Sequence, residues 1–250
     1  MRIKFVLSLI VFFLNSHHLI SQKLLINIPS AETEAEYIWR TIQDIKFFEE
    51  HNYQVSLPNG KLIEELKEKA KSGELTNGDY DKLEMYIKKS VYKKEDYLNG
   101  YRKIQKEEEL ILKMINQIDA SDFKWNFKEF DSYQVNLTLY GPGGSYNPDE
   151  GSILIFTTPG GQFKNYQNPV NTIIHEIVHI GIEESIISKY NVPHALKERI
   201  VDTFVSLNFG QFLPEYRIQD MGDFRLDPLI KEASDLNDLE NIVEIILSEK

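Results

Sequence analysis

Residues 171–181 have the sequence NTIIHEIVHIG, in which His175 and His179 stand four positions apart with Glu176 directly after the first of them. Four residues are slightly more than one helical turn, so both imidazoles project from one face of a helix, close enough to share an ion. This is the HExxH arrangement, in which two imidazoles hold Zn²⁺ and the carboxylate takes a proton from the zinc-bound water. We therefore predict a metal site here, with Glu176 as general base.

The flanks of this motif decide how the helix packs. Ile173, Ile174, Ile177, Val178 and Ile180 are apolar, and Glu176 is the only charged residue between Asn171 and Ile182. A helix this apolar is expected to be buried, and buried histidines and glutamates need partners, which a metal would provide. The alternative is an amphipathic helix with a half-buried histidine and a solvated His–Glu pair.

The amino terminus predicts export. A short basic region (1–4) precedes an apolar run (5–14) that is broken only by Ser8 and is too short to span a bilayer, and Ser21 offers a small residue for cleavage. We interpret residues 1–21 as a cleavable signal peptide of a bacterial periplasmic or secreted protein, with no stable membrane association afterwards. The chain has no cysteine, so neither a disulfide framework nor a lipid-modified cysteine is available.

Charge limits the partners. The net charge is −11, and removal of Arg2 and Lys4 with the signal makes it −13. Nucleic acid and anionic membrane surfaces are therefore not expected as partners. Residues 131–250 carry 8 basic and 18 acidic groups, so the half that contains HExxH is the acidic one.

The pattern of apolar residues predicts an α+β fold that is mainly helical. Residues 22–130 form a helical region, with Ser30 as an N-cap and breaks at Pro58–Gly60, Gly73 and Asn99–Gly100. Residues 131–250 form the catalytic region, in which strands at 133–140 and 152–158 pair as an antiparallel hairpin. That hairpin is either an ordinary core element or an edge that aligns an extended peptide. The two regions could also form one compact domain.

A catalytic zinc needs a third protein ligand and one open position. Glu183 continues the histidine face, but it lies eight residues beyond His175, about 12 Å along the axis, which is too far for one ion. A second helix, expected from His194 to about Asn208 after Pro193, carries Glu198 and Asp202 on one face. If Glu198 is the third ligand, Asp202 can hydrogen-bond the free nitrogen of a ligating histidine.

HExxH followed about twenty residues later by ExxxD resembles the gluzincin metallopeptidases, the thermolysin-like clan. The resemblance covers about residues 135–205 and implies a zincin-like catalytic part, with Glu198 as ligand and Asp202 supporting His175. It also implies that Tyr190, eleven residues after His179, helps to hold the oxyanion. The spacing between the motifs differs by about one residue from the best-known members.

Three other residues are candidates without support from a motif. His194 lies four residues before Glu198 and could be a ligand, an oxyanion donor, or a solvated helix-start residue. Tyr216 and Arg217, in the segment after the second helix, are further candidate oxyanion donors.

The sequence thus predicts an exported zinc metallopeptidase acting on a peptide or protein substrate, with Zn²⁺ on His175, His179 and Glu198. The first alternative is a non-catalytic exported binding protein with a structural zinc site, and the second is an interaction protein without metal. Glu176 favours the enzyme, because a structural site has no need of a base.

Overall fold

The computed structural model describes residues 22–118, 123–164, 166–220 and 222–249 and has an α+β architecture. The signal peptide expected at residues 1–21 lies outside the described residues. The α-helices and strands follow one another in the order β1 (Lys23–Asn27), α1 (Ala31–Gln43), α2 (Ile45–Glu50), α3 (Lys61–Ser72), α4 (Asn77–Tyr86), α5 (Leu98–Lys106), α6 (Glu108–Ile115), β2 (Ser132–Thr138), β3 (Ser145–Asn147), β4 (Ser152–Phe156), α7 (Val170–Ile182), α8 (His194–Phe209) and α9 (Leu239–Ser248). Short π-helical turns follow α4 (Ile87–Val91) and α7 (Glu183–Ser188), and 3₁₀ turns lie at Lys94–Tyr97, Phe224–Leu226 and Ala233–Asp238.

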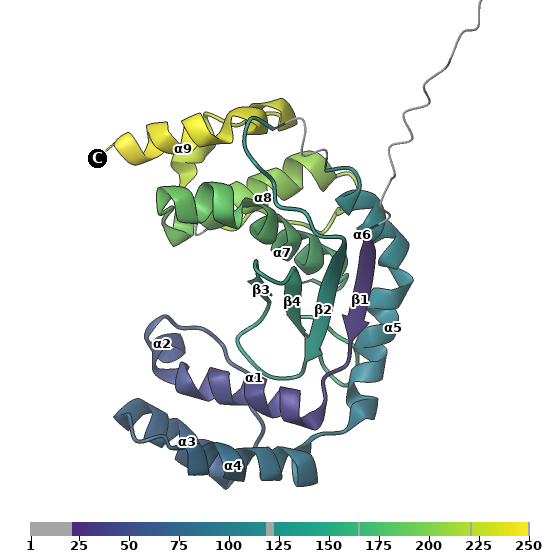
Figure 1. The fold of residues 1–250 in the computed structure, drawn as a ribbon, viewed down its shortest axis with the longest axis vertical. Helices are drawn as coiled ribbons and strands as arrows, with labels where there is room; N and C mark the ends of the chain where they lie inside the picture. Colours follow the sequence, from purple (N-terminus) through teal and green to yellow (C-terminus); the bar gives the residue numbers. More distant parts are fainter. Residues whose placement is uncertain (1–21, 119–122, 165, 221, 250) are drawn as a thin grey trace, which may run out of the picture.

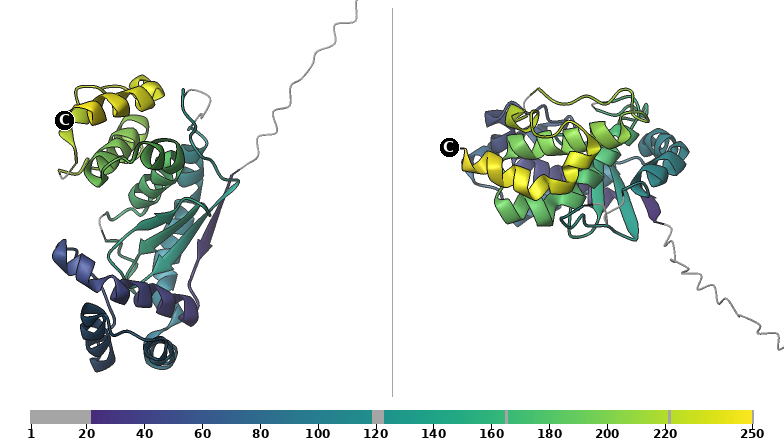
Figure 2. Two further views of the ribbon diagram at one scale, coloured as in Figure 1. Left: turned by 60° about the vertical axis from the view of Figure 1, so that its left-hand side comes forward. Right: turned by 90° about the horizontal axis from the view of Figure 1, so that it is seen from above.

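The sheet occupies the middle of the molecule. Figure 1 shows α1–α4 at one end of it, α7–α9 at the other, and α5 and α6 along the side of β1. The left view of Figure 2 shows the same arrangement, with α9 at the end of the molecule opposite α1–α4.

The four strands run in the order β1-β2-β4-β3. β1 pairs parallel to β2, β2 pairs parallel to β4, and only β3 is antiparallel to its neighbour. The predicted antiparallel hairpin of residues 133–140 with 152–158 is therefore wrong. The chain reverses between these two strands and forms β3, so the antiparallel hairpin is β3–β4. β4 therefore lies between β2 and β3, with Ile153 and Ile155 buried on one face and Leu154 and Phe156 partly buried on the other.

β1, like β3, is a strand that the sequence pattern did not predict. It is only five residues long, and of these only Leu24 is buried. Its pairing with β2, from Lys23 opposite Ser132 to Asn27 opposite Asn136, joins the start of the described chain to the middle of the fold.

The helix signals in the first half are largely confirmed. The Ser30 side chain accepts a hydrogen bond from the Thr33 N–H at 3.1 Å, and α3 ends at Gly73 with φ of 73°. The break expected at Asn99–Gly100 is wrong, since α5 runs through it. A Cβ at Gly100 would lie 2.6 Å from Thr157 Oγ1, so this glycine permits close packing beside the sheet and does not end a helix.

The buried apolar side chains form two clusters. The smaller one lies among α1, α3, α4 and the π turn after α4, and consists of Ala35, Ile38, Ile42, Ile63, Leu66, Leu83 and Ile87. The larger one combines the sheet and α7–α9 with side chains of β1, α5 and α6. The expected helical region, 22–130, thus contributes to both cores. Among the described helices, none combines the length and apolar character needed to cross a bilayer.

Candidate metal centre

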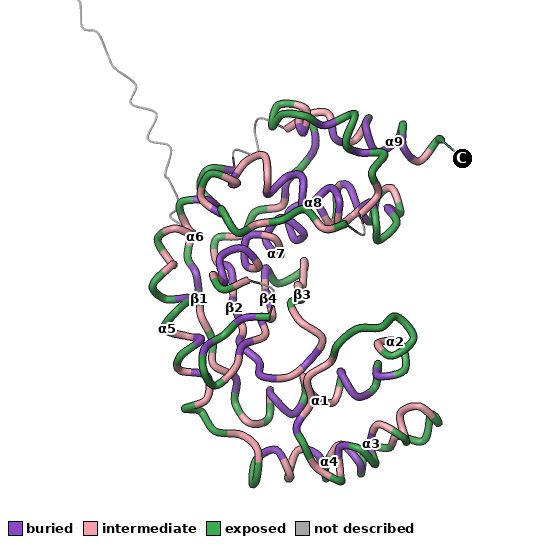
Figure 3. Tube along the Cα trace, turned by 180° about the vertical axis from the view of Figure 1, so that it is seen from behind, coloured by how far each residue is buried: buried purple, intermediate pink, exposed green. Residues whose placement is uncertain are grey.

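α7 carries HExxH and is almost entirely buried. Asn168 Oδ1 accepts from the Val170 N–H at 2.9 Å, which satisfies one free donor of the first turn. The helix packs against α6, α8, β3 and β4, and its trace in Figure 3 is mostly buried. This confirms the buried helix expected from the run of isoleucine and valine, and it fixes the histidine face towards α8.

α8 supplies the acidic side of the site. It begins at His194, directly after Pro193, and ends at Phe209, close to the predicted bounds. Glu198 and Asp202 lie on the face towards α7, and Asp202 is 1% exposed. On another face, Arg199 is buried and forms a two-bonded ion pair with Asp227, which fastens the helix to the segment that follows it.

The three predicted ligands converge. Nε2 of His175 and Nε2 of His179 are 3.0 Å apart, and each lies 3.5 Å from Oε2 of Glu198. Among the described residues, these three side chains form the one group of this kind that could hold a metal ion.

The spacing of the donor atoms fits a metal. An ion bound tetrahedrally at about 2.0–2.1 Å holds its ligand atoms about 3.3 Å apart, and the three separations are 3.0, 3.5 and 3.5 Å. Two imidazole nitrogens and one carboxylate oxygen form a donor set typical of zinc hydrolases. Because imidazole and carboxylate also bind other divalent metal ions, the donor set favours zinc without excluding other first-row transition metals.

Glu176 lies beside this cluster and takes no part in it. The residue is 8% exposed, and a Cβ on Gly144 would lie 2.7 Å from its Oε1. The loop before β3 therefore reaches the Glu176 carboxyl group closely because residue 144 has no side chain. Burial raises the pKa of Glu176 to about 7, although the nearby His175 opposes this shift.

Burial and hydrogen bonding divide the charge unequally within the cluster. Burial alone would lower the pKa of His175, but hydrogen bonds to Asp202 and Glu198 outweigh it and raise that pKa to about 10. Burial lowers the pKa of His179 to about 4. Burial opposes ionisation of Glu198, yet its hydrogen bonds with the two histidines hold its pKa well below the usual range. Glu198 is therefore an anion, as a ligand must be.

Asp202 supports His175 partly through a third residue. Asp202 Oδ1 is 3.3 Å from His175 Nδ1, while the Tyr216 hydroxyl lies 2.6 Å from the same nitrogen and donates to Asp202 Oδ1 at 2.7 Å. The other carboxylate oxygen accepts from the Gln219 N–H at 2.7 Å. Because Tyr216 lies on the Nδ1 side, away from the donor cluster, its expected role as an oxyanion donor is wrong, and it orients His175 instead.

Tyr146, on β3, is the residue that sequence reasoning missed. Its ring stacks on His179 with centroids 4.7 Å apart, and its hydroxyl donates to Glu183 Oε2 at 2.7 Å. Nδ1 of His179 is buried and has no hydrogen-bond partner among the described residues, so stacking holds this ring. Tyr146 follows a glycine-rich loop and belongs to a three-residue strand, too short for any periodic signal.

The remaining candidates lie at different distances from the cluster. His194 Nδ1 is 3.6 Å from Glu198 Oε1, and the side chain is 58% exposed, so His194 stands at the rim of the site. Tyr190 packs partly buried against the larger core with Lys189 over its ring, and none of its described contacts reaches the cluster. The backbone of Arg217 forms hydrogen bonds with the Tyr166 hydroxyl, and none of the described contacts places its guanidinium at the cluster.

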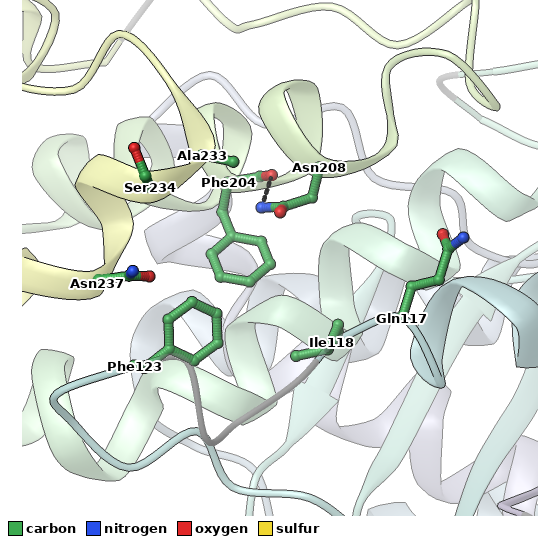
Figure 4. Close-up of a pocket in the computed structure, with 8 residues that line it drawn as sticks. All are labelled: Gln117, Ile118, Phe123, Phe204, Asn208, Ala233, Ser234 and Asn237. Atoms are coloured by element: carbon green, nitrogen blue, oxygen red, sulfur yellow. Dashed lines mark hydrogen bonds between the residues drawn. The ribbon is translucent and has the colours of Figure 1, made fainter.

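A cavity of about 270 Å³ lies on a different face of α8. It is lined by neutral side chains from α8, from the residues on either side of 119–122 and from the 3₁₀ turn before α9. They are Gln117, Ile118, Phe123, Phe204, Asn208, Ala233, Ser234 and Asn237 (Figure 4). None of these eight side chains is titratable, so the described part of the lining offers no group for acid–base or metal chemistry.

Comparison of the chain with family models, with curated proteins and with solved structures finds no match in any of the three. We therefore infer function from the geometry of the site alone.

Proposed function

We propose that the protein is an exported zinc metallopeptidase of gluzincin type, which hydrolyses peptide bonds with His175, His179 and Glu198 as metal ligands. The observation that carries the proposal is the convergence of these three donor atoms at separations of 3.0 to 3.5 Å, with a buried carboxyl group beside them. The acidic charge of the chain disfavours nucleic acid as an alternative substrate.

The ion would supply Lewis-acid chemistry, which lowers the pKa of water and polarises a carbonyl group. Glu176 accepts a proton from the attacking water and delivers it to the leaving amine. Glu176 suits this role because it lies beside the ligands without being one, so its carboxyl group stays free to exchange a proton. The Gly144 backbone limits the movement of that group.

The oxyanion requires a donor on the open side of the cluster. His194 is the candidate that the contacts favour, because it is exposed and lies 3.6 Å from the ligand Glu198. Tyr190 remains the candidate implied by the family resemblance, and it would have to turn away from its packing against the larger core to act.

Metal analysis together with a peptide digest tests the proposal. The purified chain is expected to hold about one zinc ion, and Glu176→Gln is expected to keep it while losing about 10²–10⁴-fold in turnover. Glu184→Gln is the matched control, because Glu184 is in the turn after α7, is 74% exposed and pairs only with Lys128. Undiminished turnover in Glu176→Gln would remove Glu176 from its role.

The same experiment separates the alternatives. Bound zinc with no cleavage of any peptide would support a structural zinc in a binding protein. A purified chain without metal, with thermal stability unchanged by chelation, would support an interaction protein without a metal site.

A further inference from the structure

Apart from Glu176, which lies beside the ligands, three carboxylates near the metal centre are engaged by other groups of the protein. Glu198 meets both histidines, and Asp202 accepts from Tyr216 and Gln219. Glu183 accepts from the Tyr146 hydroxyl on one oxygen and from the Ser188 hydroxyl at 3.0 Å on the other. These acids therefore have little capacity left to pair with a further cation.

Lys197 is a cation at the same site with no such partner. Its Nζ donates to the Tyr146 hydroxyl oxygen at 3.2 Å, and no carboxylate oxygen of the described residues forms an ion pair with it. The ammonium also lies over the Tyr146 ring, 5.5 Å from its centroid. A neutral hydroxyl uses one of the three ammonium protons, so neither contact supplies a negative charge. Among the 8 basic residues of the acidic half, 131–250, this one lies beside the metal ligands.

The position of Lys197 is fixed by Tyr146 and by α8. Tyr146 covers His179 with its ring and contacts Lys197 at its hydroxyl, so the ammonium lies on the His179 side of the cluster. His194, one helical turn earlier, presents an exposed imidazole beside Glu198.

We propose that Lys197 is an anion-recognition subsite, so that the preferred substrates are peptides with a carboxylate next to the cleaved bond. That carboxylate is either the side chain of an acidic residue or the free carboxyl terminus of the peptide. The inference rests on the proposed function, because it names the substrate class of the same site. A half-buried ammonium without a carboxylate partner gains a charge-assisted hydrogen bond when such a substrate binds.

Paired peptides test the subsite. One pair of N-acetylated peptides differs only by Asp against Asn at a single position, scanned along the peptide, and a second pair differs by a free carboxyl against an amide at the carboxyl end. We expect the chain to favour the carboxylate member of one pair by about tenfold in kcat/KM at low salt. The pair that shows the preference identifies the source of the carboxylate, and 1 M salt should weaken that preference.

Variants of the full-length chain assign the effect to Lys197. Lys197→Met should bring the ratio to about one, and Lys197→Arg should retain most of it. Lys197→Gln can keep the hydrogen bond to Tyr146 while losing the charge. It therefore distinguishes recognition of the substrate carboxylate by the charge from a structural role of the bond to Tyr146. Lys189→Met is the control, since Lys189 pairs with Glu240 away from the cluster and its loss should leave the ratio unchanged.

Two outcomes overturn the subsite: equal use of both members of each pair by the unmodified chain, or a ratio that persists in Lys197→Gln and Lys197→Met. Cleavage with no such preference would reject Lys197 while leaving the proposed function intact. Equilibrium binding of the same peptides to the Glu176→Gln chain tests the subsite independently of hydrolysis. A tenfold binding preference that Lys197→Gln removes would support the subsite even if no peptide were cleaved.

Discussion

Tyr216→Phe tests how the metal centre is held together. The change removes one hydroxyl that lies 2.6 Å from His175 Nδ1 and donates to Asp202 Oδ1 at 2.7 Å. Because the hydroxyl hydrogen is used by Asp202, the oxygen can only accept at Nδ1, which places the proton of His175 on Nδ1. In the metal-bound form, the unprotonated Nε2 would then face His179 and Glu198, as a ligand requires.

The expected loss follows from these contacts. Removing an outer partner of a metal-binding histidine costs about 10–100-fold in metal affinity. Asp202 Oδ1 is already 3.3 Å from Nδ1 and can move in to replace part of the interaction, so we expect the lower end, about tenfold. Competition for Zn²⁺ against a chromophoric chelator measures the affinity, and nitrogen-15 chemical shifts of His175 report its tautomer.

Tyr166→Phe is the matched control for this substitution. The Tyr166 ring stacks on Tyr216 with centroids 5.8 Å apart, but its hydroxyl meets only the backbone of Arg217. Its removal should leave zinc affinity unchanged. If Tyr216→Phe binds zinc as tightly as the unmodified chain and keeps the His175 tautomer, Asp202 alone orients the ligand and the reasoning is refuted.

Three further substitutions test other contacts. Gly144→Ala places a Cβ 2.7 Å from Glu176 Oε1, so turnover should fall by about 10–100-fold with zinc content unchanged; equal turnover would show that the loop yields easily. Gly181→Ala places a Cβ 2.0 Å from the buried Phe127 ring, and urea unfolding should show a loss of about 1–3 kcal/mol even though alanine favours the helix. Glu34 is fully buried and accepts from the Leu139 N–H at 2.9 Å, and burial raises its pKa. The folded state therefore holds this proton more tightly than the unfolded state, so the contribution of Glu34 to stability is greatest below about pH 4.3 and is lost as pH rises through the raised pKa. Glu34→Gln should remove that part of the pH dependence in urea midpoints, and an unchanged profile would contradict the assignment.

The three candidate ligands could be predicted because their signal is local. His175 and His179 share a face through helical periodicity alone, and so do Glu198 and Asp202, so each pair follows from its spacing. The spacing does not say that the two helices pack against each other with these faces together. That expectation came from the resemblance to gluzincins. The structure places Glu198 Oε2 3.5 Å from both histidine nitrogens, as that expectation requires.

The strand pairing could not be predicted because alternation of apolar residues does not specify a partner. The segment 133–140 reads the same whether its neighbour runs parallel or antiparallel. The choice depends on the path of residues 139–151, which return as β3 and leave β4 beside β2. β1 was missed for a related reason, because five residues carry too short a pattern to be recognised as a strand.

The residues that hold the histidines in place are tertiary in origin. Tyr146 reaches His179 from the sheet edge, and Tyr216 reaches His175 from the segment after α8. The chain has 13 tyrosines, and nothing in their spacing distinguishes these two from Tyr190. A tyrosine at a metal centre is selected by the distance of its hydroxyl group from a specific nitrogen or carboxylate, which is a property of the folded chain.

The segment after α8 therefore belongs to the site and is more than a tail. Asp202 is almost fully buried, and two of its hydrogen bonds come from Tyr216 and the Gln219 backbone. Burying the Asp202 carboxylate without those two donors would cost free energy. α7 and α8 alone would therefore leave Asp202 buried with unsatisfied hydrogen-bond acceptors. The Arg199–Asp227 pair fastens the same segment to another face of α8. The HExxH and ExxxD motifs supply the donor atoms, and the segment after α8 supplies the hydrogen bonds that stabilise the buried Asp202.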